Sequence, residues 1–302
     1  GTTGTVIGDV VTPTLNTTPE SYELHQAFAQ MVEAGCEYAV MEVSSQGIKM
    51  HRTDGLYFNY AIFTNISPDH IGPGEHADFE EYLYYKTRLL NMCGIGLVNK
   101  DDKHAPQIIK AANCELYTYS EESKEADFVA SDIRYVSQPD FVGTEFHISG
   151  KYDMEVRLGI PGLFNVVNAL AAVSVCSFLG LDQARISHAL ENIRVNGRME
   201  IVYTSERCTV LVDYAHNAVS MESLLSTLRD YKPKRLVCVF GCGGNRSKDR
   251  RYSMGEIGGK LADLSIITAD NSRYEKVEDI IADIRGSIEK TGGSFIEIPD
   301  RR

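Results

Sequence analysis

Short apolar runs and longer periodic stretches alternate along the chain. The runs at 38–41 and 60–63 are four residues long, and each one leads into polar residues. Runs this short, bounded by turn-forming residues, are typical of strands buried in a parallel sheet. Between them, residues 20–34 predict a helix that starts at Thr18-Pro19 and closes at Gly35. The alternation of strand and helix predicts a mostly parallel sheet.

The same alternation continues to residue 120 and restarts near residue 200, after the N-G-R-M-E stretch at 196–200. Residues 126–160 differ, because three alternating segments split by Gly and Pro predict a small antiparallel insert. The further predicted elements are helices over 79–90, 104–112, 163–179, 182–192, 219–230, 252–262 and 277–290, and strands over 94–99, 116–119, 208–213, 235–240, 264–268 and 294–298.

These elements predict an α/β fold with two domains, for which 302 residues provide ample core. Residues 1–197 are expected to form a central domain with the mostly parallel sheet and the antiparallel insert. Residues 198–302 are expected to form an incomplete Rossmann-like domain. Both ends interrupt strand-like segments, and the first residue is Gly1. We therefore expect the chain to be a piece of a longer polypeptide.

Charge and cysteine content narrow the class of partner. The formal net charge is −12 without a long basic tract, which argues against nucleic acid or an anionic membrane. The seven cysteines include no C-x-x-C, which fits reduced thiols in the cytoplasm. No apolar run approaches the length of a membrane span. We expect a cytoplasmic monomer that binds small molecules, and the basic cluster at 246–251 suits an anionic one.

Polar side chains follow the first two predicted strands. Glu42 comes directly after the run at 38–41, and Asp69 and His70 lie shortly after the run at 60–63. In open α/β sheets, ligands bind outside the carboxyl ends of the strands. A carboxylate and an imidazole there could hold Mg²⁺ together with phosphate and water, or Asp69 and His70 could act as an acid/base pair.

Lys86 is unusual because it lies in an apolar stripe. On a helix over 79–90 it shares a face with Tyr82, Leu83 and Leu90. In one interpretation the lysine stem is buried and the ammonium reaches water. In the other, the amine is desolvated, has a lowered pKa and is available for chemistry.

Three loops of the second domain are candidates for ligand binding. The G-C-G-G-N-R stretch at 241–246 lies between a strand and a helix, so it could hold phosphate or form an empty turn. Asp213, His216 and Asn217 could bind a ligand, or could be a helix cap and a surface histidine. In D-N-S-R at 270–273, Asn271 or Ser272 could cap a helix, while Arg273 could clamp a carboxylate.

Ten stretches, taken in order, resemble the Mur ligase family of ATP-dependent amide-forming enzymes in peptidoglycan synthesis, and most closely its MurE type. Each stretch alone is weak evidence, but their order over nearly the whole chain is specific. They are N-T-T at 16–18, M-E-V-S-S at 41–45, H-R at 51–52, F-T-N-I-S-P-D-H at 63–70, Lys86, G-x-F-N-x-x-N at 162–168, G-R-M-E at 197–200, D-Y-A-H-N at 213–217, F-G-C-G-G-N-R at 240–246 and D-N-x-R at 270–273.

The resemblance implies a role for each group of residues. Glu42 and His70 would ligate Mg²⁺, and Lys86 would carry a CO₂-derived carbamate that helps to place a second Mg²⁺. The UDP-muramoyl substrate would be held by Asn16, Thr17, Thr18, Ser44 and Arg52. ATP would lie near Asn165, Asn168, Arg198, Asp213, His216, Asn245 and Arg246, and the incoming amino acid near Asp270, Asn271 and Arg273.

The implied reaction adds a diamino acid to UDP-N-acetylmuramoyl-L-alanyl-D-glutamate. The D-glutamyl carboxylate would attack the γ-phosphate of ATP, and the amine would then displace phosphate from the acyl phosphate. Arg273 favours meso-diaminopimelate, because its second carboxylate needs a cation. The stretches at 67–76 and 213–221 are more similar to lysine-adding relatives, so L-lysine stays open.

The chain also departs from the family pattern. The Gly-Lys-Thr phosphate loop expected before Gly1 does not occur, so this chain alone is not expected to hydrolyse ATP. Gln46 stands where many relatives have His, and Ala218 where Pro is usual. Two alternatives therefore remain: a binding protein without catalysis that retains UDP-muramoyl-peptide binding, or a ligase similar to folylpolyglutamate synthase.

Overall fold

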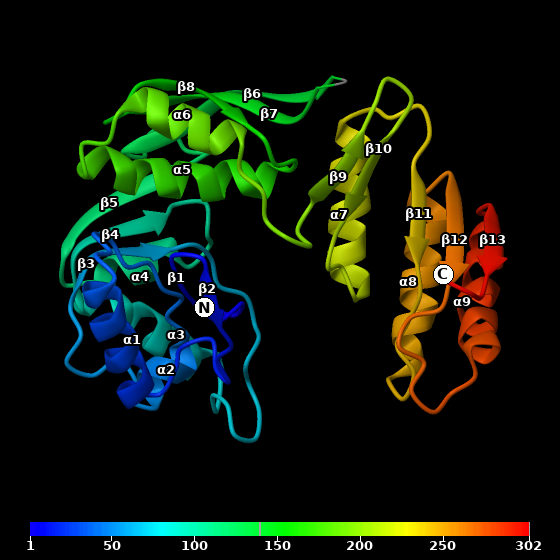
Figure 1. The fold of residues 1–302 in the computed structure, drawn as a ribbon, viewed down its shortest axis with the longest axis horizontal. Helices are drawn as coiled ribbons and strands as arrows, with labels where there is room; N and C mark the ends of the chain where they lie inside the picture. Colours follow the sequence, from blue (N-terminus) through cyan, green and yellow to red (C-terminus); the bar gives the residue numbers. More distant parts are fainter. Residues whose placement is uncertain (139, 302) are drawn as a thin grey trace. The chain divides into compact units, whose positions relative to one another are not determined.

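A computed structural model of the chain describes residues 1–138 and 140–301 (Figure 1). By internal contacts, the chain divides into two compact units. The domain boundary expected at 197/198 stays a prediction. The first unit comprises Gly1–Ser131, Ile148–Asp153 and Leu170–Leu181, and the second comprises Asp132–His147, Met154–Ala169 and Asp182–Arg302.

The first unit begins with an antiparallel hairpin of β1 (Thr5–Ile7) and β2 (Val10–Thr12). Helix α1 (Ser21–Glu33) follows, and Gly35 after it has a φ of +76°, which glycine adopts at little cost. The helix expected over 20–34 is confirmed, but its N-cap is Glu20, so the cap expected at Thr18-Pro19 is wrong. Thr18 cannot cap α1 because its side chain is fully buried and its hydroxyl is bonded to the 42–44 backbone.

The strand expected at 38–41 does not form in this structure. Tyr38 and Val40 are 58% and 95% exposed, and the segment runs without regular structure to the short helix α2 (Ser45–Lys49). A strand needs a neighbour to accept its backbone hydrogen bonds. Within 1–138 and 140–301, no strand pairs with this segment, so its apolar side chains stay at the surface.

A six-stranded sheet in the order β3-β4-β5-β6-β7-β8 confirms the predicted central sheet. The pairs β3–β4, β4–β5 and β5–β6 are parallel, as the alternation of strand and helix predicts. The segments expected to form an antiparallel insert continue this same sheet, which is therefore mixed. The strands are β3 (Phe58–Phe63), β4 (Cys93–Asn99), β5 (Glu115–Ser120), β6 (Phe128–Gln138), β7 (Phe141–Gly150) and β8 (Met154–Leu158).

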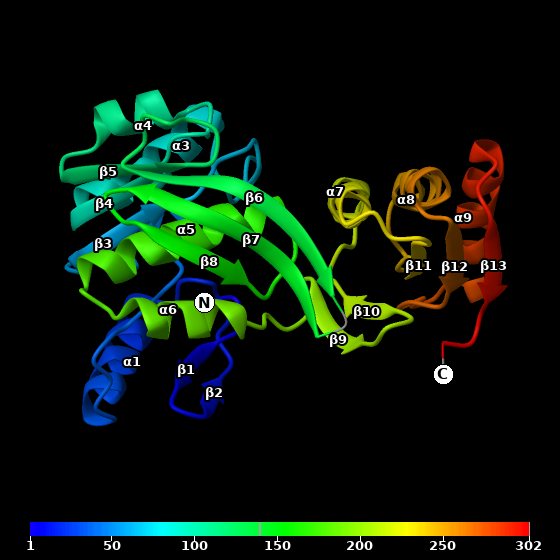
Figure 2. The same cartoon turned by 90° about the horizontal axis from the view of Figure 1, so that it is seen from above.

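Helices cover both faces of the parallel part of this sheet (Figure 2). On one face, α3 (Phe79–Arg88), the short turn η1 (Leu89–Asn91) and α4 (Ala105–Ala111) enclose a core with Ala61 and Phe63. On the other face, Phe178 at the end of α5 (Leu163–Phe178) stacks on Tyr60. Alternate residues of β3 thus point to opposite faces, as the strand pleat requires. Helix α6 (Gln183–Glu191) follows, with Asp182 as its N-cap.

The remainder of the second unit begins with an antiparallel pair, β9 (Glu200–Thr204) and β10 (Thr209–Val212). The strand expected at 208–213 is confirmed as β10, but it pairs with β9 in an antiparallel hairpin and lies outside the parallel sheet of this unit. The parallel sheet is β11 (Val237–Phe240), β12 (Leu264–Thr268) and β13 (Phe295–Ile298).

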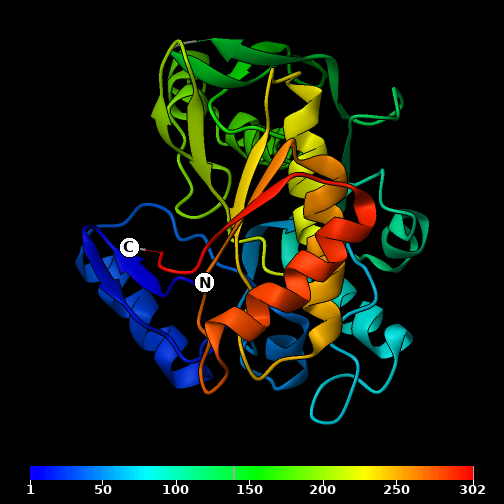
Figure 3. The same ribbon diagram turned by 90° about the vertical axis from the view of Figure 1, so that its right-hand side faces the viewer.

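Three helices lie on one face of this parallel sheet (Figures 2 and 3). They are α7 (Ala218–Asp230), α8 (Lys248–Leu261) and α9 (Val277–Thr291). Helix α8 begins four residues earlier than the expected residue 252, because Ser247 accepts a hydrogen bond from the Asp249 N–H as its cap. Ile267, Ile284 and Ile288 are fully buried between the sheet and these helices. No helix in the described part of the chain is long and apolar enough to cross a membrane.

The one-sided packing of this sheet generates a stability prediction. Ile267 is fully buried on the helix side, whereas Ile296, on a neighbouring strand, is 43% exposed. We expect Ile267→Ala to lower the free energy of unfolding by about 2–5 kcal/mol, because it removes buried methyl groups and leaves a cavity. The matched Ile296→Ala change should cost less than about 1 kcal/mol in urea unfolding. Equal losses would contradict the packing described here.

Candidate functional site

The first group of candidate residues surrounds the buried side chain of Thr18. The Thr18 hydroxyl donates to the Glu42 carbonyl (3.0 Å) and accepts from the Ser44 N–H (2.9 Å). Ser44 in turn caps α2 by accepting from the Gly47 N–H at 3.0 Å. Gly47 is required because a Cβ there would lie 2.8 Å from the Cβ of Thr18. The Thr18 side chain therefore positions the 42–44 backbone.

Arg52 and Asn16 join the same group through Glu20. The Arg52 guanidinium forms an ion pair with Glu20 (2.8 Å) and donates to the Thr18 carbonyl (3.3 Å). Asn16 Nδ2 donates to the same Glu20 carboxylate at 3.4 Å. The structure thus brings together four of the five residues expected to hold the UDP-muramoyl substrate, Asn16, Thr18, Ser44 and Arg52; Thr17, between them in sequence, is half-buried.

The Glu42 carboxylate is hydrogen-bonded to Thr2. Its Oε2 accepts hydrogen bonds from the Thr2 N–H (2.8 Å) and the Thr2 hydroxyl (2.7 Å). These bonds, the side-chain one foremost, hold the pKa of Glu42 below its ordinary value. Glu42 is therefore a carboxylate at neutral pH, and no hydrogen bond to its Oε1 is seen among the described residues.

His70 lies in the 66–78 loop with a φ of +55°, an uncommon conformation for a residue with a side chain. Its Nδ1 is 3.4 Å from the Glu75 carboxylate, and its ring packs edge-on against Tyr82 with centroids 5.8 Å apart. The ring is more than half exposed. The His70 imidazole is thus accessible from solvent and oriented by an acidic neighbour.

His76 has a structural role that the sequence did not predict. It is fully buried, and its Nε2 lies 2.8 Å from the Ser45 hydroxyl, which connects the 66–78 loop to α2. Burial, aided by the positive charge of Lys49, lowers the pKa of His76. Its place in the polar S-P-D-H-I-G-P-G-E-H run gave no signal of burial.

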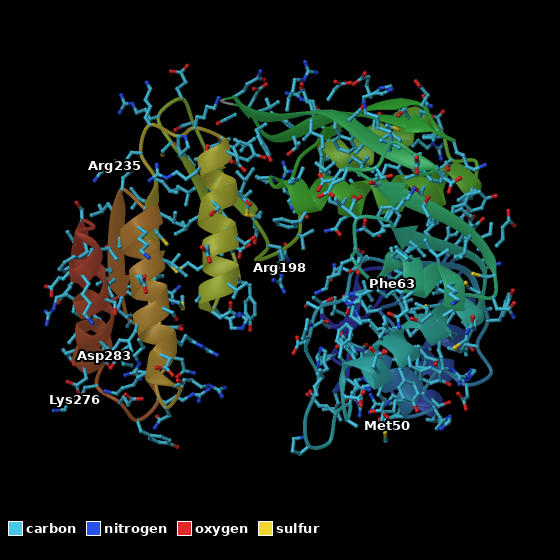
Figure 4. The ribbon with its side chains drawn as sticks, turned by 180° about the vertical axis from the view of Figure 1, so that it is seen from behind. Met50, Phe63, Arg198, Arg235, Lys276 and Asp283 are labelled. Carbon is cyan, nitrogen blue, oxygen red and sulfur yellow. The ribbon has the colours of Figure 1, made fainter. Side chains whose placement is uncertain are left out.

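Lys86 is on α3, and its Nζ donates to the Asn65 carbonyl at 3.1 Å. The ammonium lies over the rings of Phe63 (5.8 Å) and Tyr82 (5.4 Å), and Phe63 ends β3 (Figure 4). The expected apolar stripe is confirmed, since Leu83 and Leu90 are buried beside it. Burial lowers the pKa of Lys86, although Asp102 and Asp69 oppose the shift. Lys86 is half-buried, so its stem lies in the apolar stripe, and the desolvated form of its amine stays a prediction.

Two acidic residues that follow β4 bond the backbone of neighbouring loops, and one of them holds the start of the loop that leads to His70. Asp102 accepts a hydrogen bond from the Ile66 N–H (2.7 Å), and Asp101 accepts from the Glu121 N–H (2.9 Å). Burial, together with the charges of Asp101 and Glu122, raises the pKa of Glu121 to about 7. Asp101 and Asp102 lie just after the predicted strand at 94–99. Two adjacent carboxylates at the end of a strand could have indicated this polar group, but they were not among the predicted site residues.

No group of three His, Cys, Asp or Glu side chains among the described residues could by itself hold a metal ion. Glu42 and His70 provide one carboxylate and one imidazole, and a third protein donor would have to be made from another residue type. The expected ligand set Glu42, His70 and Lys86 stays a prediction.

In the second unit, Asp213 follows β10 and accepts hydrogen bonds from the N–H groups of Met199 and Ala215, both at 2.8 Å. The Arg198 guanidinium carbon lies 5.4 Å from the centroid of the Tyr214 ring (Figure 4). The exposed His216 packs on the same ring. Arg198, Asp213 and His216 are thus brought together around Tyr214. The helix-cap interpretation holds for Asn217, which caps α7 with a capping box.

Asn165 and Asn168 lie in the first turns of α5. Asn165 is buried and donates to the Pro161 carbonyl at 2.6 Å, which closes the turn before the helix. Asn168 lies one turn later and contacts the Asn165 side chain at 3.5 Å. The two amides form one group, and their expected proximity to ATP stays a prediction.

The 241–247 and 269–276 loops follow β11 and β12 and lie against each other. The Gly244 N–H donates to the Asn271 carbonyl at 2.8 Å. Asn271 and Ser272 do not cap a helix, because α9 starts at Val277 with Lys276 as its N-cap. Arg246 and Arg273 are exposed, whereas Arg251 is buried in ion pairs with Glu275 and Asp283. The basic cluster at 246–251 was expected to bind an anionic ligand. Arg251 is not available for this, because both of its partners lie within the protein.

Comparison with known proteins gives two family matches that together span most of the chain. Residues 1–176 match the Mur ligase middle domain, and residues 197–302 match the Mur ligase glutamate ligase domain. A UDP-N-acetylmuramoyl-L-alanyl-D-glutamate–2,6-diaminopimelate ligase of Caldanaerobacter subterraneus subsp. tengcongensis is 39% identical over 100% of this chain and 62% of its own length. A ligase of that name from Clostridium acetobutylicum is 40% identical over 95% of this chain and 58% of its own. The chain thus spans about three fifths of these relatives.

Solved structures agree with this match. A UDP-N-acetylmuramoyl-L-alanyl-D-glutamate–2,6-diaminopimelate ligase superposes with a TM-score of 0.78 and 32% identity, covering 100% of this chain and 62% of that chain. A folylpolyglutamate synthase from Thermotoga maritima superposes with a TM-score of 0.65 and 19% identity over 93% of this chain and 64% of that one, a likeness of fold alone.

Glu121 generates a prediction on pH and stability. Its folded pKa of about 7 is above its ordinary value, so the folded state binds the proton more tightly than the unfolded state. Protonated Glu121 thereby contributes to the free energy of unfolding. This contribution is complete at low pH and is lost as the pH rises from about 5 to about 7. Glu121→Gln, which cannot ionise, should flatten the fall in Tm across this range. Glu125→Gln, at a side chain 90% exposed, is the control and should leave the slope unchanged. An unaltered slope in Glu121→Gln would contradict the burial of this carboxyl.

Proposed function

The chain belongs to the Mur ligase family, and we propose that it carries central and C-terminal parts of an ATP-dependent ligase. The ligase would add a diamino acid to the D-glutamyl carboxylate of UDP-N-acetylmuramoyl-L-alanyl-D-glutamate. The observation that carries this proposal is the 39% identity, over all of this chain, to a ligase named for that acceptor and for diaminopimelate. Since the chain spans 62% of that relative, activity is proposed for the full-length protein.

The residues around α2 would bind the UDP-muramoyl substrate. Arg52 offers a guanidinium already oriented by Glu20, and Ser44 and Asn16 offer a hydroxyl and an amide beside it. Guanidinium and hydroxyl groups are suitable partners for phosphate and sugar oxygens. Thr18 would act through the backbone that it holds, because its hydroxyl both donates to Glu42 and accepts from Ser44. Thr17 stands next to it in the same turn.

We also propose that Lys86 carries a carbamate. Its lowered pKa increases the fraction of neutral amine, which is the form that attacks CO₂. The amine nitrogen would form a bond to the carbon of CO₂ and release one proton to water, leaving an anionic carbamate. The ammonium now lying over Phe63 and Tyr82 would thereby be replaced by a group with oxygen donors.

Glu42 and His70 would then ligate one Mg²⁺, and the carbamate of Lys86 would help to place a second. Oxygen donors suit Mg²⁺, which retains several waters. Bound there, Mg²⁺ would supply the charge neutralisation that phosphoryl transfer requires. Glu42 fits this role because its lowered pKa keeps it ionised. His70 fits because its ring is accessible and oriented by Glu75.

The nucleotide and the amino acid would bind to residues of the second unit. The proposed ATP residues fall into three local groups: Asn165 with Asn168, Arg198 with Asp213 and His216, and Asn245 with Arg246. The incoming amino acid would meet Asp270, Asn271 and Arg273, of which Arg273 is an exposed cation with a φ of +51°. A guanidinium fits a carboxylate bidentately, and diaminopimelate has one more carboxylate than lysine.

The reaction would proceed in two displacements. An oxygen of the D-glutamyl carboxylate would attack the γ-phosphorus of ATP, and ADP would leave as the acyl phosphate forms. The amine of the diamino acid would then attack the acyl carbon and lose one proton to water, and inorganic phosphate would leave with the bonding electron pair. Holding both reactants in register is the main contribution that such a protein makes to phosphoryl transfer.

We predict that the full-length protein releases phosphate from ATP only when both UDP-muramoyl-dipeptide and a diamino acid are present. The acyl phosphate forms without the amine, but turnover requires the amine to displace phosphate. Steady-state phosphate release should therefore be stimulated more by diaminopimelate than by lysine. Equal phosphate release without any amino acid would contradict the ligase proposal. A greater stimulation by lysine than by diaminopimelate would identify lysine as the amino acid that is added.

A second prediction concerns Lys86→Ala, which should lower ligation by about 100-fold or more, because one preorganised charged group is lost. A short added carboxylate should restore part of the activity. With ¹³C-bicarbonate, NMR of the wild type should show a carbamate signal that is absent in Lys86→Ala. Lys110→Ala, at an exposed position on α4, is the control and should retain both the signal and the activity. Full activity in Lys86→Ala would refute the carbamate.

A further inference from the structure

Arg251 is a fully charged side chain buried within the second unit. It lies on α8, and 1% of its side chain is exposed. Its Nη2 donates to both carboxylate oxygens of Glu275, each at 2.8 Å, and its Nη1 donates to Asp283 Oδ2 at 2.9 Å. Burying a guanidinium is costly unless it is paired and hydrogen-bonded. These three bonds pair both terminal nitrogens of Arg251, while its Nε is buried without a hydrogen-bond partner among the described residues.

The two carboxylates belong to different parts of the structure. Asp283 is on α9 (Figure 4), where Lys248 also reaches it at 3.3 Å. Glu275 is in the 269–276 loop, between β12 and α9. Hydrogen bonds from Arg251 hold the pKa of Glu275 below its ordinary value, so it is ionised at neutral pH. Arg251 thus connects a helix to a loop that carries candidate ligand residues.

Glu275 extends this connection to the glycine loop. Its Oε1 also accepts the Asn245 N–H at 2.5 Å. Asn245 Oδ1 accepts the Tyr274 N–H at 3.2 Å, so Asn245 contacts the second loop through both its backbone and its side chain. Together with the bond from the Gly244 N–H to the Asn271 carbonyl, these contacts join the 241–247 and 269–276 loops along their length.

The joined loops are held in a conformation that neither would adopt freely. Asn245 and Arg273 have φ values of +52° and +51°, in the left-handed region that residues with side chains rarely occupy. At Gly244, a Cβ would lie 1.9 Å from the Ser272 carbonyl oxygen, so only glycine permits this approach. Such positions persist when surrounding bonds determine them, and the Arg251–Glu275 pair supplies the buried anchor.

We propose that Arg251 is a positioning residue that locks the 241–247 loop to the 269–276 loop. It cannot touch a ligand, yet it sets where Asn271 and Arg273 stand relative to Asn245. This inference rests on the proposed function, in which these loops bind the amino acid and ATP.

Arg229 provides a matched control in the same unit. Its guanidinium binds both oxygens of Asp263, at 3.0 and 3.1 Å, and its Nε donates to the Leu261 carbonyl at 2.9 Å. This arginine–carboxylate pair is at the far end of α8 from Arg251. Asp283→Asn is a second control, because it removes a charge partner of Arg251 without altering the loop.

The test compares Arg251→Lys with Arg229→Lys by amide hydrogen exchange and by steady-state kinetics of the full-length protein. Lysine keeps the charge but cannot bind two carboxylates in the same fork geometry. In Arg251→Lys, exchange at the Gly244, Asn245 and Tyr274 amides should accelerate by about tenfold or more, because these bonds open locally. The KM for the diamino acid should rise by about tenfold, while the KM for UDP-muramoyl-dipeptide stays unchanged.

If Arg251→Lys does not fold, Glu275→Gln tests the same link, since it leaves Arg251 in place and removes the charge that pairs with it. Because the Asn245 N–H bonds directly to Glu275, the informative amides are those of Gly244 and Tyr274. Glu275→Gln should accelerate exchange at these two amides, and Asp283→Asn should not. Equal effects of Arg251→Lys and Arg229→Lys on the loop amides, or of Glu275→Gln and Asp283→Asn, would overturn the inference. Faster loop exchange in a protein that never binds a diamino acid would support the lock and refute the proposed function.

Discussion

The candidate sites of this protein depend on buried polar side chains that satisfy the backbone of loops. A backbone N–H or carbonyl left without a partner in the interior costs free energy, so each loop near the core needs a donor or an acceptor. Thr18 serves the 42–44 segment, Asp102 serves the Ile66 N–H, and Arg251 serves the 269–276 loop through Glu275. In each case the buried side chain holds the loop, and exposed candidate residues such as His70 and Arg273 lie on loops held in this way.

This arrangement permits unusual conformations and environments at the candidate residues. His70 and Arg273 have positive φ values, which loops without such bonds would rarely maintain. Lys86 lies over two aromatic rings with its amine bonded to a backbone carbonyl, so burial lowers its pKa without leaving the nitrogen unpartnered. A lowered pKa and a hydrogen-bond partner for the amine are therefore compatible at this position.

The sequence predicted the elements with strong periodicity and failed where contacts distant in sequence decide the structure. The helix bearing Lys86 and the parallel pairs β3–β4–β5 follow from apolar spacing alone. The segment at 38–41 has the composition of a buried strand but no strand to pair with, and β10 pairs with β9 across a hairpin. Composition cannot show either outcome. The burial of Arg251 could not be predicted for the same reason. A basic residue in an exposed cluster and one in a buried ion pair have the same local sequence, and only the distant partner Glu275 distinguishes them.

The most direct test of the account is the mass of the product formed by the full-length protein from ATP, UDP-N-acetylmuramoyl-L-alanyl-D-glutamate and equal amounts of diaminopimelate and L-lysine. A Mur ligase of the proposed specificity should produce one UDP-muramoyl-tripeptide, with diaminopimelate as its third residue, and one ADP for each molecule formed. If the dipeptide substrate is recovered unchanged while the protein is folded and binds ATP, the proposed ligase activity is contradicted.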